Sequence, residues 1–222
     1  MERPPAIFGI GKNYADHAAE MRGEVPKRPV VFMKNPASII GNDEPIIIPR
    51  ICAEPQEQVD YEGELAVILG RDCRDVEEDD ALGCVGGYAI ANDVSARWWQ
   101  KEGSGGQFIR GKSFDTFCPI SEPVAAAEVP DPQALSIRTT VSGELMQDGH
   151  TSRMIFPVAR LIAELSRGTT LLKGTVILTG TPSGVGFGRT PPRFLKEDDV
   201  VEVSIDGLGT LRNEVRSEDR AG

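Results

Sequence analysis

The sequence is poor in the residues that build zinc and redox centres. It has only four cysteines in 222 residues, and no two of them have the C-x-x-C spacing of a zinc site or a redox pair. The N-terminus lacks a basic region followed by an apolar run, so we expect no export signal. We therefore expect reduced cysteines and a cytoplasmic protein.

Long apolar runs and positive charge are also scarce. No apolar run approaches the roughly 20 residues that a membrane-spanning helix needs. Acidic residues number 34 against 24 basic ones, for a formal net charge of -10. Because phosphate backbones and anionic membranes repel such a chain, we expect neither nucleic acid nor a membrane as partner. The length suits one domain, and we expect a single domain over residues 1–222.

Two carboxylates precede a predicted buried strand within residues 61–70. Alternate side chains of a strand share a face, so Glu62 and Glu64 project together. Gly63 between them allows another group to approach the backbone closely. A bound cation would relieve the repulsion of the two charges, and oxygen ligands favour a hard ion such as Mg²⁺, Mn²⁺ or Ca²⁺. A solvated strand end is the alternative.

One of only two histidines lies near a carboxylate. Residues 12–21 have a helix-forming composition, which places His17 and Glu20 on one face, three residues apart. A carboxylate that orients an imidazole is a general-base arrangement, and an ordinary surface pair is the alternative. The other histidine, His150, lies in a predicted loop, and we expect it to be non-catalytic.

Polar groups also follow two later predicted strands. Residues 86–95 predict a strand that ends at a polar tip, where Asp93 either caps a helix that begins near Ala96 or serves as a third carboxylate ligand. A buried strand at 175–179 opens onto a loop rich in glycine and threonine, 180–186, which can aim backbone N–H groups at an anion. This loop has neither a P-loop lysine nor dinucleotide-binding spacing.

Two lysines are candidates for polar sites. Lys34 ends a predicted strand at 30–34 and is a candidate for holding an anionic group. Lys112 stands between Gly111 and Ser113, where a lysine either points into a tight polar site or lies in solvent.

Five of these segments together resemble one family. In chain order they read GKNYADH (11–17), YEGELA (61–66), NDVSAR (92–97), GKSFD (111–115) and LTGTPSGVG (178–186). This order resembles that of the fumarylacetoacetate hydrolase family in its short, single-domain form, over roughly residues 6–215. The resemblance implies an α+β fold, mostly β, with mixed and antiparallel sheets rolled around a metal site and few helices. It also implies a homodimer.

The resemblance assigns roles to residues that match the family's segments. It implies Mg²⁺ or Mn²⁺ on Glu62, Glu64 and Asp93. It also implies that His17 and Glu20 are a water-activating pair, on a segment that orders when ligand binds. Lys112 matches the active-site lysine of the family. The implied substrate-binding residues are Arg22, Arg97, Gly180 and Thr181.

The implied activity is metal-dependent hydrolysis of a carbon–carbon bond in a 2,4-diketo acid. An acylpyruvate or fumarylpyruvate would give pyruvate and a carboxylic acid, after a water activated by His17 attacks C4 and Lys112 stabilises the oxyanion. The alternative is an isomerase or decarboxylase that acts on hydroxymuconate-type diacids or oxaloacetate, as in aromatic catabolism, without an attacking water. The His17–Glu20 pair favours hydrolysis. A non-catalytic metal-binding protein would lack a ligand or part of that pair, and neither is missing here.

Overall fold

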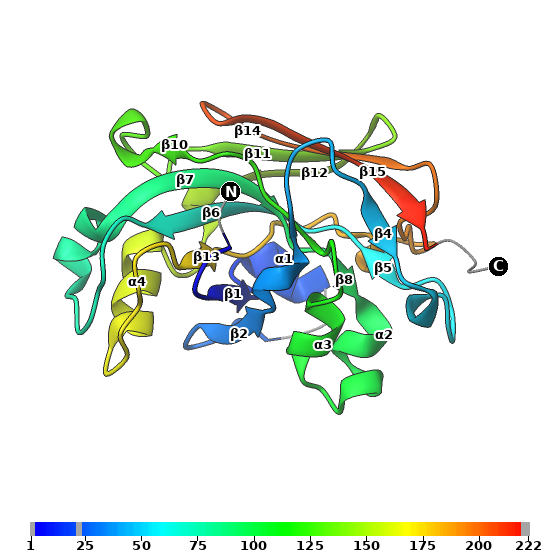
Figure 1. Ribbon diagram of the computed structural model, residues 1–222, viewed down its shortest axis with the longest axis horizontal. Coiled ribbons are helices and arrows are strands. Elements are labelled where there is room, and N and C mark those ends of the chain that lie inside the picture. The colour runs from blue at the N-terminus through cyan, green and yellow to red at the C-terminus, as the bar shows by residue number, and fades with distance from the viewer. Residues whose placement is uncertain (1–2, 21–23, 219–222) are drawn as a thin grey trace.

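Two β-sheets packed face to face form the centre of the structure (Figure 1). The computed structural model describes residues 3–20 and 24–218. The larger sheet has six strands in the order β10-β7-β6-β13-β1-β2, and the smaller has five in the order β12-β11-β14-β15-β4. Each sheet contains one parallel pair, β1 with β13 and β15 with β4, among antiparallel neighbours. The predicted fold class, mostly β with mixed sheets, is confirmed.

The strands are short and are bounded as follows. The six-stranded sheet contains β1 (Ile7–Gly11), β2 (Val30–Lys34), β6 (Gly63–Leu69), β7 (Val85–Asn92), β10 (Val124–Ala125) and β13 (Val176–Leu178). The five-stranded sheet contains β4 (Ile46–Ile48), β11 (Ser136–Val141), β12 (Glu144–His150), β14 (Val200–Ile205) and β15 (Gly209–Ser217). Two small pairs complete the set, β3 (Ile39–Ile40) with β9 (Cys118–Pro119) and β5 (Val59–Asp60) with β8 (Ser95–Ala96).

Helices are few, as expected. In the described ranges they are α1 (Ala15–Glu20), α2 (Arg97–Gln100), α3 (Phe108–Lys112) and α4 (Val158–Ser166). Short 3₁₀ helices occupy Pro36–Ser38, Arg50–Cys52, Glu78–Cys84, Glu102–Ser104, Ala126–Glu128, Thr151–Arg153 and Gly186–Gly188. None of the helices that the structure describes has the length and apolarity needed to cross a membrane.

Strand β6 has two faces that follow from the alternation of its residues. Leu65 and Val67 point into the main core between the sheets, whereas Ala66 belongs to a smaller apolar cluster on the opposite side of the six-stranded sheet. Glu64 and Glu62 continue the Ala66 side towards the start of the strand. The strand therefore carries both carboxylates away from the main core.

The register of β6 against β7 brings Asp93 to the same place. Glu64 pairs with Ala91, and the ladder continues to the Asp93 N–H, which donates to the Glu62 carbonyl at 2.8 Å. Asp93 thus lies opposite Glu62. The alternative role of Asp93 as a helix cap is wrong, because helix α2 has Ala96 at its N-cap and no side-chain cap hydrogen bond.

Most predicted elements are present, with two differences. The strand predicted at 30–34 is confirmed as β2, and the one predicted at 175–179 as β13. His150 is the last residue of strand β12 rather than part of a loop. Helix α3 was not expected, since Gly111 in its last turn weakens the helical pattern.

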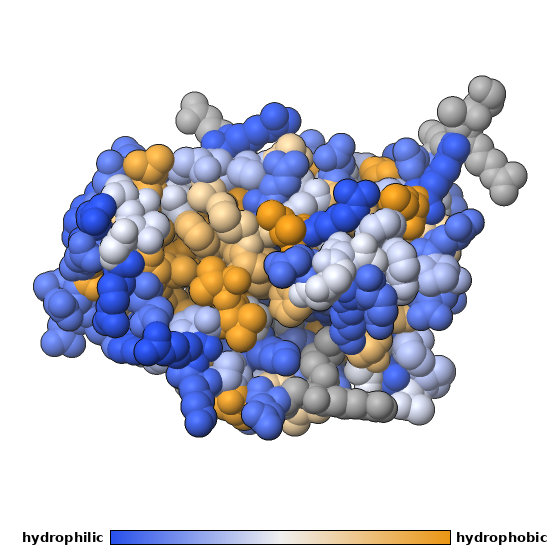
Figure 2. All heavy atoms as spheres, turned by 90° about the horizontal axis from the view of Figure 1, so that it is seen from below, coloured by the Kyte–Doolittle hydropathy of each residue, from blue (hydrophilic) through white to orange (hydrophobic). Residues whose placement is uncertain are grey.

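Apolar residues gather on the face of the molecule shown from below (Figure 2). Strand β2 lies at the lower edge of the six-stranded sheet in Figure 1, and its Val31 and Met33 are exposed large apolar residues. Exposed apolar patches are typical of protein contacts. The homodimer expected from the family resemblance stays a prediction.

Gly111 is required by the close packing of α3 against α2. A Cβ atom at this position would lie 2.4 Å from the Gln100 backbone nitrogen and 2.7 Å from the Ala96 carbonyl oxygen. Both contacts are with backbone, which cannot move aside as a flexible side chain would. The absence of a side chain at Gly111 therefore sets where the next residue, Lys112, enters the structure.

We expect Gly111→Ala to destabilise the protein by about 2 kcal/mol, because overpacking against backbone outweighs the better helix propensity of alanine. Urea unfolding measures this loss. Gly83→Ala is the matched control, since a Cβ atom at Gly83 would meet nothing within 4 Å. Equal stability of the two variants would contradict the packing role of Gly111.

Candidate active site

The predicted carboxylate cluster forms. Three buried carboxylates make up the cluster: Glu62, Glu64 and Asp93. One oxygen from each of them lies within 4.8 Å of one oxygen from each of the others. Gly63 has the predicted close neighbour, because a Cβ atom there would stand 2.3 Å from the Thr139 hydroxyl of the facing sheet. A set of three carboxylate oxygens suits a hard divalent cation.

Lysines neutralise part of this negative charge. The Lys112 ammonium donates to Glu62 Oε2 at 2.7 Å and to Asp93 Oδ2 at 2.6 Å, and Lys34 donates to Asp93 Oδ1 at 2.5 Å. Burial alone would lower the pKa of Lys112, but Asp93 and Glu62 outweigh it and raise that pKa. The anionic group predicted to bind Lys34 is therefore the carboxylate of Asp93, which belongs to the protein itself.

The two glutamates differ in their electrostatic surroundings. Burial would raise the pKa of Glu62, but Lys112 and Arg97 outweigh it and hold that pKa well below its usual range. Burial, together with the charges of Asp93 and Glu62, raises the pKa of Glu64 well above its usual range. Within the described residues Glu64 has no ion-pair partner, and its Oε2 accepts only the Gly180 N–H, at 2.7 Å. A divalent cation would supply the charge that Glu64 lacks.

A buried aspartate links this cluster to the loop after β13. Arg97 donates to Glu62 Oε1 at 2.6 Å and, through Nε and Nη2, to Asp60 Oδ2 at 2.8 and 2.7 Å. The remaining donors to Asp60 include the backbone N–H groups of Gly186 and Phe187, at 2.7 and 3.0 Å. Arg97 is thus bound by carboxylates of the protein, and its predicted contact with substrate stays a prediction.

Hydrogen bonds to strands β6 and β12 hold the glycine- and threonine-rich loop, 180–186, in place. The Thr181 hydroxyl donates to the Gly63 carbonyl at 2.9 Å and accepts from the Gln147 amide at 2.7 Å. The Gly180 N–H is occupied by Glu64, so this N–H supports a carboxylate of the cluster. Thr181, by contrast, lines the neighbouring cavity.

His17 and Glu20 form the predicted pair on α1. His17 Nδ1 lies 3.3 Å from Glu20 Oε2, and both side chains are largely buried. An ionised carboxylate only accepts hydrogen bonds, so Nδ1 carries the proton and Nε2 is left to accept one. Arg22, the other candidate from this segment, lies outside the described residues.

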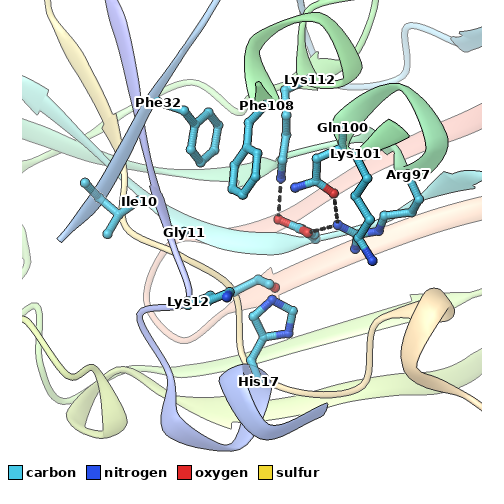
Figure 3. Close-up of a pocket in the computed structure, with 12 residues that line it drawn as sticks. Ile10, Gly11, Lys12, His17, Phe32, Arg97, Gln100, Lys101, Phe108 and Lys112 are labelled. Atoms are coloured by element: carbon cyan, nitrogen blue, oxygen red, sulfur yellow. Dashed lines mark hydrogen bonds and ion pairs between the residues drawn. The ribbon is translucent and has the colours of Figure 1, made fainter. Parts of the chain in front are cut away.

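A cavity of about 210 Å³ lies between some of these groups and is lined by His17, Glu62, Arg97, Lys112 and Thr181. Figure 3 shows His17 on one side of it and Lys112 and Arg97 on the other. The Glu62 carboxylate lies between the two cations, since it accepts from Lys112 at 2.7 Å and from Arg97 at 2.6 Å. Phe32 and Phe108, whose ring centroids are 5.7 Å apart, form an apolar wall. Two further lysines line the cavity, Lys12 and Lys101. The cavity is therefore small, and it is lined by both cationic and apolar side chains.

Comparison with known proteins identifies the family. The sequence model for the C-terminal domain of fumarylacetoacetate (FAA) hydrolase matches residues 6–216. The chain belongs to the fumarylacetoacetate hydrolase family. It is 46% identical over 213 residues to the mitochondrial oxaloacetate tautomerase fahd2 of Xenopus laevis, an alignment that covers 96% of this chain and 66% of that protein. The chain thus spans just under two thirds of that relative's length.

Crystal structures of fumarylacetoacetate hydrolase family members share the fold. The 5-carboxymethyl-2-hydroxymuconate delta-isomerase of Mycobacterium smegmatis has 39% identity and a TM-score of 0.85, with 98% of this chain and 81% of that chain covered. The fumarylacetoacetate hydrolase of Exiguobacterium antarcticum has 46% identity and a TM-score of 0.86, with 97% and 76% covered. The chain is therefore an enzyme-family member with the expected fold.

Some site residues were missed by the sequence analysis. Asp60 continues the alternation of Glu62 and Glu64 by one step, and this spacing could have identified it. Lys12, Lys101 and Gln147 have no comparable pattern around them. Their roles depend on the three-dimensional packing of segments that are distant in sequence.

We expect Glu64→Gln to weaken Mn²⁺ binding at least about 100-fold, because it removes one anionic ligand from an all-carboxylate set. The metal-free variant should be more thermostable than the wild type, since like-charge repulsion with Glu62 and Asp93 is lost. Calorimetric Mn²⁺ titration and thermal melts measure both effects, with the exposed Glu77→Gln as control. Unchanged Mn²⁺ affinity would rule out Glu64 as a ligand.

Proposed function

We propose that this protein moves a proton within a small 2-keto diacid, interconverting keto and enol forms of an oxaloacetate-type substrate. The observation that carries the proposal is the shared cavity. It places the His17 imidazole opposite the Lys112 ammonium, beside Glu62 of the buried carboxylate cluster. Tautomerisation needs a group that takes and returns a proton, together with charge stabilisation of an enolate.

The charge of the cavity suits a dianion. Lys12 lines it, and Lys101 lines it with its ammonium 3.8 Å from the Phe187 ring centroid. Arg97 and Lys112 also line the wall, but they are paired with carboxylates of the protein, so Lys12 and Lys101 are the lining cations that favour a dianion. The apolar side formed by Phe32 and Phe108 suits the short carbon chain between two carboxylates.

The chemistry follows from the protonation states of the side chains. With Nδ1–H directed at Glu20, the Nε2 atom of His17 accepts the proton from C3 of the keto acid, so that the C3–H bond breaks. The same proton then forms an O–H bond at the C2 oxygen, and the enol results without water or a co-reactant. Lys112 remains an ammonium and places positive charge near the developing oxyanion. A divalent cation on Glu62, Glu64 and Asp93 would supply further stabilisation of enolate charge.

The comparisons support this proposal over carbon–carbon bond hydrolysis. One relative is named an oxaloacetate tautomerase, and a structural relative is named a hydroxymuconate isomerase. Both names describe proton shifts in 2-keto or 2-hydroxy acids that carry two or three carboxyl groups. The cytoplasmic location expected from the sequence stays a prediction.

Hydrolysis of a 2,4-diketo acid is the second candidate. The His17–Glu20 pair favours it, because an imidazole oriented by a carboxylate is suited to activating a water molecule. The two reactions differ in their products. A tautomerase changes only the position of a proton, whereas a hydrolase releases pyruvate and a second carboxylic acid.

A side-by-side assay tests the proposal. Metal-stripped protein with Mg²⁺ or Mn²⁺ added back is given enol-oxaloacetate, a hydroxymuconate-type diacid and acetylpyruvate, and ultraviolet absorbance, pyruvate and CO₂ are followed. We expect metal-dependent acceleration of ketonisation with no pyruvate. Metal-dependent pyruvate matched by acetate from acetylpyruvate, with no effect on oxaloacetate, would replace the proposal by hydrolysis. Pyruvate matched by CO₂ would make the enzyme a decarboxylase.

His17→Ala should lower turnover by about 10²–10⁴-fold, the usual contribution of a general base, while Mn²⁺ affinity stays at the wild-type level. The matched control is His150→Ala, because His150 contacts Ser152 at the end of β12 and lies away from the cavity lining. Wild-type turnover in His17→Ala would show that another group moves the proton.

A further inference from the structure

The Glu20 carboxylate is bound on two sides. One oxygen faces His17 Nδ1 at 3.3 Å, and the Gly184 N–H donates to Oε1 at 3.0 Å and to Oε2 at 3.2 Å. The turn at 184–188 therefore fixes the carboxylate that orients the imidazole. This turn comes from the far end of the chain and meets α1 only in the folded protein.

Gly188 in this turn leaves the space that Glu20 fills. A Cβ atom at Gly188 would lie 2.3 Å from Glu20 Cγ, 2.5 Å from Cδ and 2.6 Å from Oε1. The φ angle of Gly188 is outside the left-handed region, so its backbone conformation is open to any residue. Glycine is thus required here by space rather than by conformation.

The turn cannot easily move away from Glu20. Asp60, which is fully buried, holds Gly186 and Phe187 by their N–H groups at 2.7 and 3.0 Å. The same aspartate binds Arg97, which in turn binds Glu62 of the carboxylate cluster. A side chain added at Gly188 would therefore displace Glu20 rather than the turn.

We propose that Gly188 is a positioning residue, whose missing side chain keeps Glu20 in place and so keeps His17 in the tautomer with a proton on Nδ1. The inference rests on the proposed function only in taking His17 as the group that moves the proton. The same turn is hydrogen-bonded to Asp60, which binds Arg97, and Arg97 binds Glu62 of the carboxylate cluster. The position of Glu20 is therefore linked to that of the cluster.

Nitrogen-15 NMR of the imidazoles tests this directly, because the chain has only two histidines. In Gly188→Ala we expect the His17 signals to move and the Nδ1–H tautomer to lose population, while the His150 signals stay fixed as an internal reference. Turnover should fall about 10-fold or more with Mn²⁺ affinity unchanged. Gly41→Ala is the control variant, since the nearest contact of a Cβ atom there is 3.5 Å away. Unmoved His17 signals in Gly188→Ala would overturn the proposal.

A double-mutant cycle gives a second test that does not depend on catalysis. Gly188→Ala should lower the thermal midpoint by about 3 °C or more in the wild-type background, as overpacking does in a domain of this size. In the Glu20→Ala background the same change should have little effect, because the clashing side chain is gone. Equal shifts in both backgrounds would show that Gly188 serves the turn itself.

Failure of this inference is distinguishable from failure of the proposed function. The NMR and the thermal cycle use the free protein and need no substrate. Moved His17 signals without turnover of any substrate would remove the proposed function and keep the positioning role. Ketonisation that is equally fast in Gly188→Ala would keep the function and remove the role.

Discussion

Three carboxylates are buried together where β6 and β7 end, and the rest of the site is arranged around their repulsion. Burial of even one uncompensated charge costs several kcal/mol. Lys112, Lys34 and Arg97 offset the charge of Glu62 and Asp93, but Arg97 is shared with the buried Asp60. Among the described residues Glu64 is bound only by a backbone N–H. Four buried carboxylates, Asp60 included, thus face three cations, and this shortfall is the physical reason to expect a divalent cation there.

The cations that offset this charge also connect the site. Arg97 binds Glu62 on one side and Asp60 on the other, and Asp60 holds the turn whose Gly184 N–H binds Glu20. A chain of buried hydrogen bonds thus runs from the carboxylate cluster to the imidazole. Because buried polar groups are costly when left without partners, each member of this chain constrains the next. The imidazole and the cluster consequently keep a fixed relation across the cavity.

The same arrangement explains why family membership alone does not name a reaction. A carboxylate cluster, an ammonium and an oriented imidazole can stabilise an enolate whether it arises by proton transfer or by bond cleavage. Proton transfer and bond cleavage differ in whether an attacking water must enter the cavity and in which acid binds there. Here the extra lysines, Lys12 and Lys101, and the aromatic wall favour a short dianion.

Two features of the site follow from local sequence patterns: the alternation of β6 puts Glu62 and Glu64 on one face, and His17 and Glu20 are three residues apart on a helix. Five ordered segments also indicate the family, and with it the fold class. The resemblance also implied Asp93 as a ligand, but the residues alone left it open whether Asp93 caps a helix, and the register of β6 against β7 was needed to place it beside Glu62. The roles of Asp60, Lys34 and Gly188 follow only from the tertiary structure, because their partners are distant in sequence. Local patterns report which way a side chain points, whereas its partner is fixed only when the sheets pack.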